Sequence, residues 1–166
     1  MGEIVRIGSL EIDQDLDHQR REWRLERLGW VLGALIIAAA ALGLFGSGPL
    51  SSSEAAAGPD FHVAYERFLR HGSSNRITLS VDTGARRVLP MEVPSAYLAR
   101  MRLEQVFPEP RRVASLPGWT RFEFDVEPDT RMVIVMDFAP ARRGPSDGAF
   151  RRPDGPTVRF RQFVYP

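Results

Sequence analysis

Apolar residues dominate one stretch of the chain, from Leu28 to Phe45, which contains no charged residue. As a helix, these 18 residues would extend about 27 Å, because each residue adds about 1.5 Å, and this length approaches the hydrocarbon thickness of a bilayer. The stretch therefore predicts a single transmembrane α-helix, which we assign to residues 28–46. Trp23 and Trp30 are expected to anchor this helix at the membrane interface, where tryptophan is enriched.

Arginines before the apolar stretch predict its orientation. The segment QRREWRLERLGW leads into the stretch without a proline, whereas no Lys or Arg follows it until Arg67. Positive charge favours the cytoplasmic side of a membrane. We therefore expect residues 1–27 to form a cytoplasmic arm and juxtamembrane helix of a single-pass (bitopic) protein in the bacterial inner (plasma) membrane, with a periplasmic C-terminal domain. The alternative is a cleaved signal peptide, although the charged region here is longer than such peptides carry.

Small residues characterise both the apolar stretch and the segment that follows it. Gly29 and Gly33 lie four residues apart, and such pairs let two membrane helices approach each other closely. They predict association with another integral membrane protein or with a second copy of the chain. Residues 47–59 are rich in Gly, Ser and Ala, and this composition predicts a linker.

Apolar and polar residues alternate in the remainder of the chain. In the segment WTRFEFDVE, Phe122, Phe124 and Val126 alternate with charged residues, which is typical of a strand with one buried face. About seven such segments, separated by Gly/Pro-rich turns, predict that residues 60–166 form an all-β domain, an antiparallel β-sandwich of immunoglobulin-like size. A short helix is expected to begin at Ser95.

Composition and charge narrow the function classes. All 22 basic residues are arginine, and 21 acidic residues bring the formal net charge to +1. This balance gives no general basis for a nucleic-acid partner, because nucleic-acid binding relies on excess positive charge. Residues 1–28 carry a net charge of −2 and residues 60–166 one of +4, so the β domain is mildly basic. The sequence contains no cysteine, which excludes disulfides and thiolate metal sites.

The three histidines are too scattered to predict a metal site, and we predict no metal and no cofactor. A metal would require the fold to bring His62 and His71 together with Asp60 or Glu66. Surface or hydrogen-bonded histidines are the simpler interpretation.

The segment Asp82-Thr83-Gly84-Ala85 follows the apolar residues LSV. It resembles the Asp-Thr-Gly-Ala motif of retropepsin-like aspartic proteases. The resemblance implies a dimer in which Asp82 of each copy shares a proton and activates water, supported by Thr83 and Gly84. The second element of that family, two apolar residues followed by Gly, has no complete counterpart here, because the apolar run at 133–137 ends in Asp. The alternative interpretation is a hairpin turn built on Asp82 and Gly84.

Paired arginines mark a Gly/Pro-rich stretch near the C-terminus. Arg142, Arg143, Arg151 and Arg152 lie in this stretch, which is expected to be a loop. Guanidinium groups bind anions through bidentate contacts, so these residues are candidates for binding an anionic lipid or a cell-wall polymer. The alternative role of such arginines is to keep the surface soluble.

Three segments carry a wider resemblance. The arm QRREWRLERLGW, the segment YERFLRHG and the C-terminal FRQFVYP resemble a group of small uncharacterised single-pass bacterial envelope proteins. The resemblance implies the topology described above and no activity. Because no polar residues converge into a catalytic set, the leading hypothesis is a non-enzymatic, membrane-anchored accessory or interaction subunit of an envelope membrane complex. The alternatives are a membrane-anchored dimeric aspartic protease using Asp82 and a binder of anionic lipid or cell-wall polymer.

Overall fold

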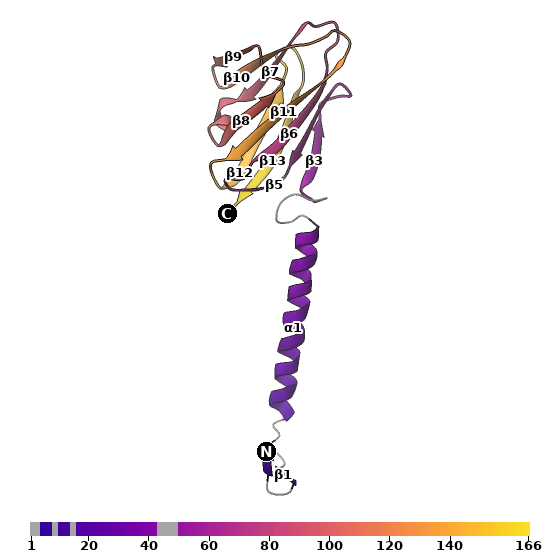
Figure 1. Cartoon of the computed structure of the whole chain (residues 1–166), viewed down its shortest axis with the longest axis vertical. Helices are drawn as coiled ribbons and strands as arrows, with labels where there is room; N and C mark the ends of the chain where they lie inside the picture. Colours follow the sequence, from indigo (N-terminus) through magenta and orange to yellow (C-terminus); the bar gives the residue numbers. More distant parts are fainter. Residues whose placement is uncertain (1–3, 8–9, 14–15, 43–49) are drawn as a thin grey trace. The chain divides into compact units, whose positions relative to one another are not determined.

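The chain folds into two compact units, which are described separately: Met1–Ala41 and Leu42–Pro166. The computed structural model describes most of both units: residues 4–7, 10–13, 16–42 and 50–166. The N-terminal unit contains an antiparallel strand pair and one long helix (Figure 1): β1 (Ile4–Ile7), β2 (Leu10–Asp13) and α1 (Leu16–Ala41).

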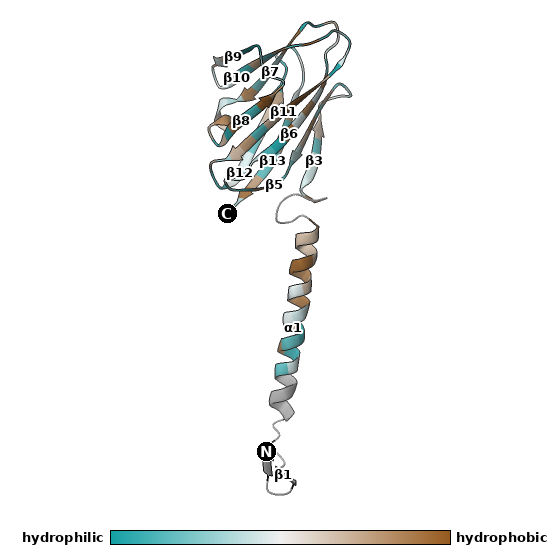
Figure 2. Ribbon diagram, viewed as in Figure 1, coloured by the Kyte–Doolittle hydropathy of each residue, from teal (hydrophilic) through white to brown (hydrophobic). Residues whose placement is uncertain are grey.

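The uncharged part of α1 is shorter than the apolar stretch in the sequence. Within the helix it runs from Leu28 to Ala41, and these 14 residues extend about 21 Å, against about 30 Å for the hydrocarbon core of a bilayer. Charged residues occupy the turn before it, and Figure 2 shows this hydrophilic portion of α1. Across the described ranges, no helix is long and apolar enough to cross a membrane.

This finding corrects several predictions. The prediction of a transmembrane helix at residues 28–46 is wrong. The predictions of a single-pass topology and of an inner-membrane localisation with a cytoplasmic N-terminus and a periplasmic domain are therefore wrong as well. Residues 43–46 of the predicted span lie outside the described residues. The error arose because the sequence pattern shows where an uncharged run ends but not where the helix ends.

Two β-sheets face each other in the C-terminal unit (Figure 1). The five-stranded sheet has the order β3-β4-β6-β11-β8, and all its neighbouring strands are antiparallel. Its strands are β3 (Ser52–Ala56), β4 (Phe61–Glu66), β6 (Asn75–Asp82), β11 (Arg131–Pro140) and β8 (Met101–Phe107).

The six-stranded sheet has the order β5-β13-β12-β7-β10-β9. Its strands are β5 (Phe68–Arg70), β13 (Thr157–Tyr165), β12 (Gly144–Arg151), β7 (Val88–Pro94), β10 (Trp119–Asp125) and β9 (Arg112–Leu116). Strands β13 and β5 run parallel, whereas the other neighbouring pairs are antiparallel. The chain therefore forms an all-β, two-sheet domain with one parallel pair.

The core lies between the sheets and is built from the alternating residues of both. Ile77, Leu79 and Val81 on β6 are almost completely buried, as are Phe122 and Phe124 on β10. Their neighbours along each strand are more exposed. This period of two residues explains why the inward faces of these strands could be identified from the sequence.

Two segments differ from the sequence predictions. Strand β3 lies inside the predicted linker, residues 47–59, so the sheet begins before the predicted domain boundary at residue 60. Strand β12 occupies residues 144–151, where a loop was predicted. Its inward residues include Ser146 and Gly148, which carry no apolar signal.

A short helix, α2 (Ser95–Leu98), follows β7. Ser95 is its first helical residue, and no side chain caps it. The helix buries Tyr97, whose hydroxyl donates a hydrogen bond of 2.7 Å to Gln162 Oε1 in β13. Burial raises the pKa of Tyr97, so its hydroxyl stays a donor at ordinary pH.

Candidate functional site

An open groove lies on the outer face of the six-stranded sheet and encloses about 760 Å³. Its lining comes from four neighbouring strands, β10, β7, β12 and β13. The lining residues are Pro94, Trp119, Asp147, Gly148, Ala149, Arg151, Thr157, Arg159, Phe160 and Arg161. Register pairs Arg151 with Thr157, Ala149 with Arg159, and Asp147 with Arg161, so these residues share one face. We call this site the outer-face groove.

A row of charged residues crosses the sheet along one side of the groove. Glu92 on β7 pairs in register with Arg121 on β10 and with Arg151 on β12. Arg121 donates two hydrogen bonds to Glu92 Oε1, from Nε at 2.9 Å and from Nη2 at 2.7 Å. Arg151 Nε donates to Glu92 Oε2 at 2.6 Å. One carboxylate therefore holds two guanidinium groups on opposite sides.

The Glu92 side chain is only 1% exposed, although it belongs to the outer face, because the two arginines cover it. Burial alone would raise the pKa of Glu92, but the hydrogen bonds from Arg121 and Arg151 outweigh this effect and lower that pKa. The Arg151 guanidinium also lies 3.7 Å from the centroid of the Trp119 ring, in a cation–π contact. Arg151 is thus fixed from two directions and forms a rigid wall of the groove.

Positive charge exceeds negative charge around the groove. Glu92 neutralises only one of its two arginines, and Asp147 accepts a hydrogen bond from Arg161 Nε at 2.9 Å. Arg159 has no ion-pair partner within the described part of the chain. Four arginines thus face two carboxylates, and the groove keeps a positive potential that attracts anions.

The chemistry of this lining suits binding. Guanidinium groups donate hydrogen bonds and cannot accept them, and they stay protonated at any physiological pH. The polar groups at the groove include one hydroxyl, that of Thr157, and one carboxylate already engaged by an arginine, that of Asp147. No nucleophile is paired with a base in this lining, and its guanidinium groups are donors that can hydrogen-bond to an anion.

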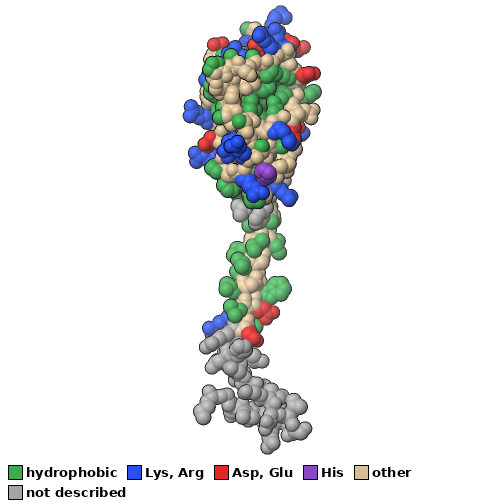
Figure 3. Space-filling view, turned by 90° about the vertical axis from the view of Figure 1, so that its left-hand side faces the viewer, with side chains coloured by type: hydrophobic (Ala, Val, Ile, Leu, Met, Phe, Trp, Pro, Cys, Tyr) green, Lys and Arg blue, Asp and Glu red, His purple; other side chains and the backbone are tan. Residues whose placement is uncertain are grey.

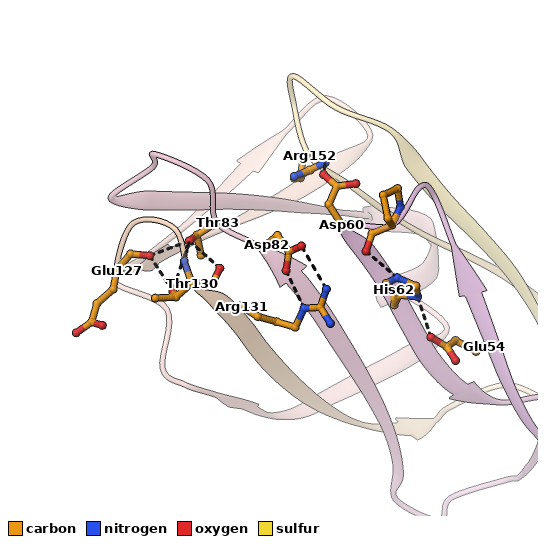
Figure 4. A network of polar contacts seen from close by, with 10 residues as sticks. Glu54, Asp60, His62, Asp82, Thr83, Glu127, Thr130, Arg131 and Arg152 are labelled. Carbon is orange, nitrogen blue, oxygen red and sulfur yellow. Dashed lines mark hydrogen bonds and ion pairs between the residues drawn. The ribbon is translucent and has the colours of Figure 1, made fainter.

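Asp82, the catalytic candidate of the protease hypothesis, lies at the end of β6 and faces Arg131 on β11 (Figure 4). Arg131 donates to Asp82 from Nε at 2.7 Å and from Nη2 at 3.2 Å. These hydrogen bonds lower the pKa of Asp82. A proton-sharing carboxyl pair instead needs one raised pKa. The contacts therefore favour a structural role for Asp82, and the protease hypothesis gains no support from them.

The residues after Asp82 form a crossing between the two sheets, because β6 and β7 belong to different sheets. The hairpin predicted at this position is therefore wrong, although Gly84 does adopt a turn conformation with a φ of 53°. Thr83 is completely buried. Its Oγ1 lies 2.8 Å from the carbonyl oxygen of Glu127 and 2.9 Å from that of Thr130, and it accepts the Thr130 N–H at 3.0 Å.

Replacing Thr83 with valine is expected to lower the free energy of unfolding by about 1–2 kcal/mol, because the buried hydroxyl is lost and the part-buried Thr130 N–H loses its acceptor. Urea denaturation of the full chain measures this change. Thr83→Ser keeps the hydroxyl and should recover most of the stability. Asp82→Asn affects a half-exposed ion pair and should cost less than Thr83→Val. A larger loss in Asp82→Asn would contradict the assignment of Thr83 as the main structural residue of the motif.

Two further polar contacts lie beside Asp82 in Figure 4. Arg152 Nη2 donates to Asp60 Oδ2 at 2.7 Å, which joins the end of β12 to the start of β4, and this hydrogen bond lowers the pKa of Asp60. His62 Nδ1 lies 2.9 Å from Glu54 Oε1, and its Nε2 lies 3.0 Å from the Pro59 carbonyl oxygen. Both ring nitrogens of His62 therefore lie within hydrogen-bond distance of an oxygen.

The histidines and acids considered for a metal are not brought together. His71 Nε2 lies 3.4 Å from the Ala141 carbonyl oxygen, whereas His62 contacts Glu54 and Pro59. Within the described residues, no group of three His, Asp or Glu side chains is arranged to hold a metal ion.

The four arginines that were predicted to lie together in a loop have different environments in the structure. Arg142 and Arg143 are exposed between β11 and β12. Arg151 belongs to the outer-face groove, and Arg152 is largely buried in its contact with Asp60. The sequence pattern did not single out Glu92, Arg121, Trp119, Arg159 or Arg161 as site residues. The alternation in WTRFEFDVE placed Arg121 outward, but no sequence signal paired it with Glu92.

The helix candidates lie on α1. Gly29 and Gly33 line a shallow groove with Glu26, Trp30 and Ile37, and a Cβ added at either glycine meets no atom within 4 Å. Figure 3 shows hydrophobic side chains along the visible face of α1. Association through these glycines stays a prediction.

The membrane-anchor role of Trp23 and Trp30 loses its basis with the transmembrane helix. Trp30 is 74% exposed. The ring of Trp23 instead lies under the guanidinium of Arg27, 3.7 Å from its ring centroid.

No family model matches this chain, and no curated protein matches it. Among solved structures, it is similar to a cohesin module from the family 33 glycoside hydrolase of Clostridium perfringens, with 15% sequence identity and a TM-score of 0.41. The match covers 63% of this chain and 95% of that chain. The architecture assigned here follows from the strands and pairings described above.

Proposed function

We propose that this protein is a non-enzymatic binding protein that takes up an anionic ligand in the outer-face groove. The observation that carries the proposal is the shared carboxylate of Glu92, which orients Arg121 and Arg151 and leaves one of the two positive charges without a counter-ion. Arg159 adds a second such charge. The proposal keeps the interaction role expected from the sequence and moves it from the predicted arginine loop to a sheet face.

Preorganisation supports this proposal over a merely solubilising role for the arginines. A solvated arginine loses side-chain entropy when it binds a ligand. Arg151 has already lost much of that freedom, because Glu92 and Trp119 hold it. Binding at this position therefore costs less than binding at the exposed Arg142 or Arg143 of the preceding connection.

The binding of a polyanion to the full chain tests the proposal. Fluorescence anisotropy of fluorescein-labelled polyglutamate and of fluorescein-labelled polygalacturonate, each titrated at low ionic strength, gives the affinity. Arg159→Ala is expected to weaken at least one of these complexes about tenfold, the effect of losing roughly 1.4 kcal/mol from a charge-assisted contact. Binding should also weaken as salt is added, because the contacts are partly exposed.

Arg142→Ala is the matched control, because it removes the same charge from an exposed position outside the groove. Its affinity should change by less than about twofold. Equal losses in both variants would assign the attraction to overall charge and overturn the groove. If neither polyanion binds, the proposed function is overturned.

A further inference from the structure

The outer-face groove offers a ligand mainly side chains, and Gly148 adds main-chain atoms to the lining. Neither β7 nor β12, which lie under it, is an edge strand of the sheet, although the two pair with each other in register only at Glu92 and Arg151. A peptide cannot add to this face as an extra strand. Recognition here depends on what the side chains donate, accept and cover.

These side chains offer many more hydrogen-bond donors than acceptors. Arg151, Arg159 and Arg161 supply donors, and the side-chain acceptors in the groove are Asp147, which Arg161 engages, and Thr157. A bound peptide would bring main-chain N–H groups that need acceptors, and an amide buried without one costs free energy. A sugar hydroxyl can rotate and accept a hydrogen bond from a guanidinium, so a glycan meets this lining without the same cost.

Small and flat apolar groups form the floor between the charged side chains. Pro94 pairs with Trp119 in register, and Ala149 is paired with Arg159. Pro94, Trp119 and Ala149 line the groove and form an apolar surface for the face of a ring, and two cations, Arg151 and Arg159, lie beside this surface. A pyranose ring has apolar C–H faces, and a uronic acid carries a carboxylate on that ring.

We infer that the ligand of the outer-face groove is an acidic polysaccharide built from uronic acids, with a ring on the Pro94–Ala149–Trp119 floor and its carboxylate bound by Arg159 and Arg151. This inference rests on the proposed function and names its ligand class. The carboxylates supply the negative charge that the groove lacks, and the hydroxyls accept the remaining guanidinium donors.

Isothermal titration of the full chain with three matched probes tests the inference. The probes are tetragalacturonate, its fully methyl-esterified form, and a tetraglutamate peptide that is acetylated at its N-terminus and amidated at its C-terminus. Tetragalacturonate and the peptide carry the same number of carboxylates. Tetragalacturonate should bind about tenfold or more tightly than the peptide, because one unsatisfied amide costs enough for a factor of that size. The uncharged ester should bind more weakly than tetragalacturonate by at least the same factor, since it lacks the carboxylates.

Two variants separate ring recognition from charge. Ala149→Leu fills the floor and should bring the affinity ratio of tetragalacturonate to peptide close to one, and the smaller change Ala149→Val should lower that ratio if Ala149→Leu does not fold. Arg159→Ala should weaken the binding of both charged probes. A peptide that binds as tightly as tetragalacturonate would overturn the acidic glycan and leave the anion-binding function standing. Failure of both charged probes to bind would overturn both, as would an ester that binds as tightly as the acid.

Discussion

Replacement of Glu92 with glutamine is expected to lower the free energy of unfolding by about 2–3 kcal/mol. Removing one member of a fully buried ion pair typically costs about 3–5 kcal/mol, and the value here is reduced because the guanidiniums of Arg121 and Arg151 are partly exposed. The amide nitrogen of glutamine would also face a guanidinium, donor against donor. Thermal unfolding should show the loss as a decrease in Tm of about 4–12 °C.

The pH dependence of this loss identifies its electrostatic origin. The folded pKa of Glu92 is lowered, so its stabilising effect is complete above the unfolded value near 4.5 and disappears as the pH falls through the folded pKa. The stability difference between the wild-type chain and Glu92→Gln should therefore shrink below about pH 4.5. Asp125→Asn, which changes an exposed carboxylate on the neighbouring strand β10, is the control and should leave the stability nearly unchanged. A difference that does not vary with pH would contradict the ion-pair account.

Period-two alternation made part of this fold predictable. The inward positions of β6 and β10 follow directly from residues such as Leu79 and Phe124, because side chains of a strand alternate between its two faces. Strand β12 was not predicted, because its sequence lacks this alternation. Its inward positions at Ser146 and Gly148 are polar or lack a side chain, and its flanks are rich in Gly and Pro. Only its pairing with β13 and β7 defines it as a strand.

The candidate site was less predictable than the fold because it depends on register between distant strands. Glu92 and Arg151 are separated by 59 residues, and they meet because β7 and β12 are neighbours in the sheet. An alternating strand shows which of its residues face outward but does not show which outward residue of another strand lies opposite. The same limit applies to Asp82, because its short motif does not show that Arg131 on the neighbouring strand β11 lies opposite it.

Replacement of Gly148 with alanine is expected to lower the free energy of unfolding by about 2–3 kcal/mol, in the upper range of the cost of overpacking a core. Gly148 on β12 faces inward, and a Cβ at this position would overlap the ring of Phe160 on β13. That ring cannot move aside easily. It stacks on Phe150 at a centroid distance of 5.6 Å and meets the edge of Tyr97 at 5.7 Å. Chemical denaturation of the full chain measures the loss.

A second substitution shows whether the overlap with Phe160 is the cause. Phe160→Leu shortens the side chain opposite Gly148 and is destabilising by itself, because it leaves space among the rings around Phe150. Combined with Gly148→Ala, it provides room for the added methyl group. The double variant should therefore be more stable than the sum of the two single losses predicts, by about 1 kcal/mol or more. Strictly additive losses would show that the alanine acts through the backbone of β12 rather than through the ring of Phe160, and the close approach of glycine to that ring would then have no role in stability.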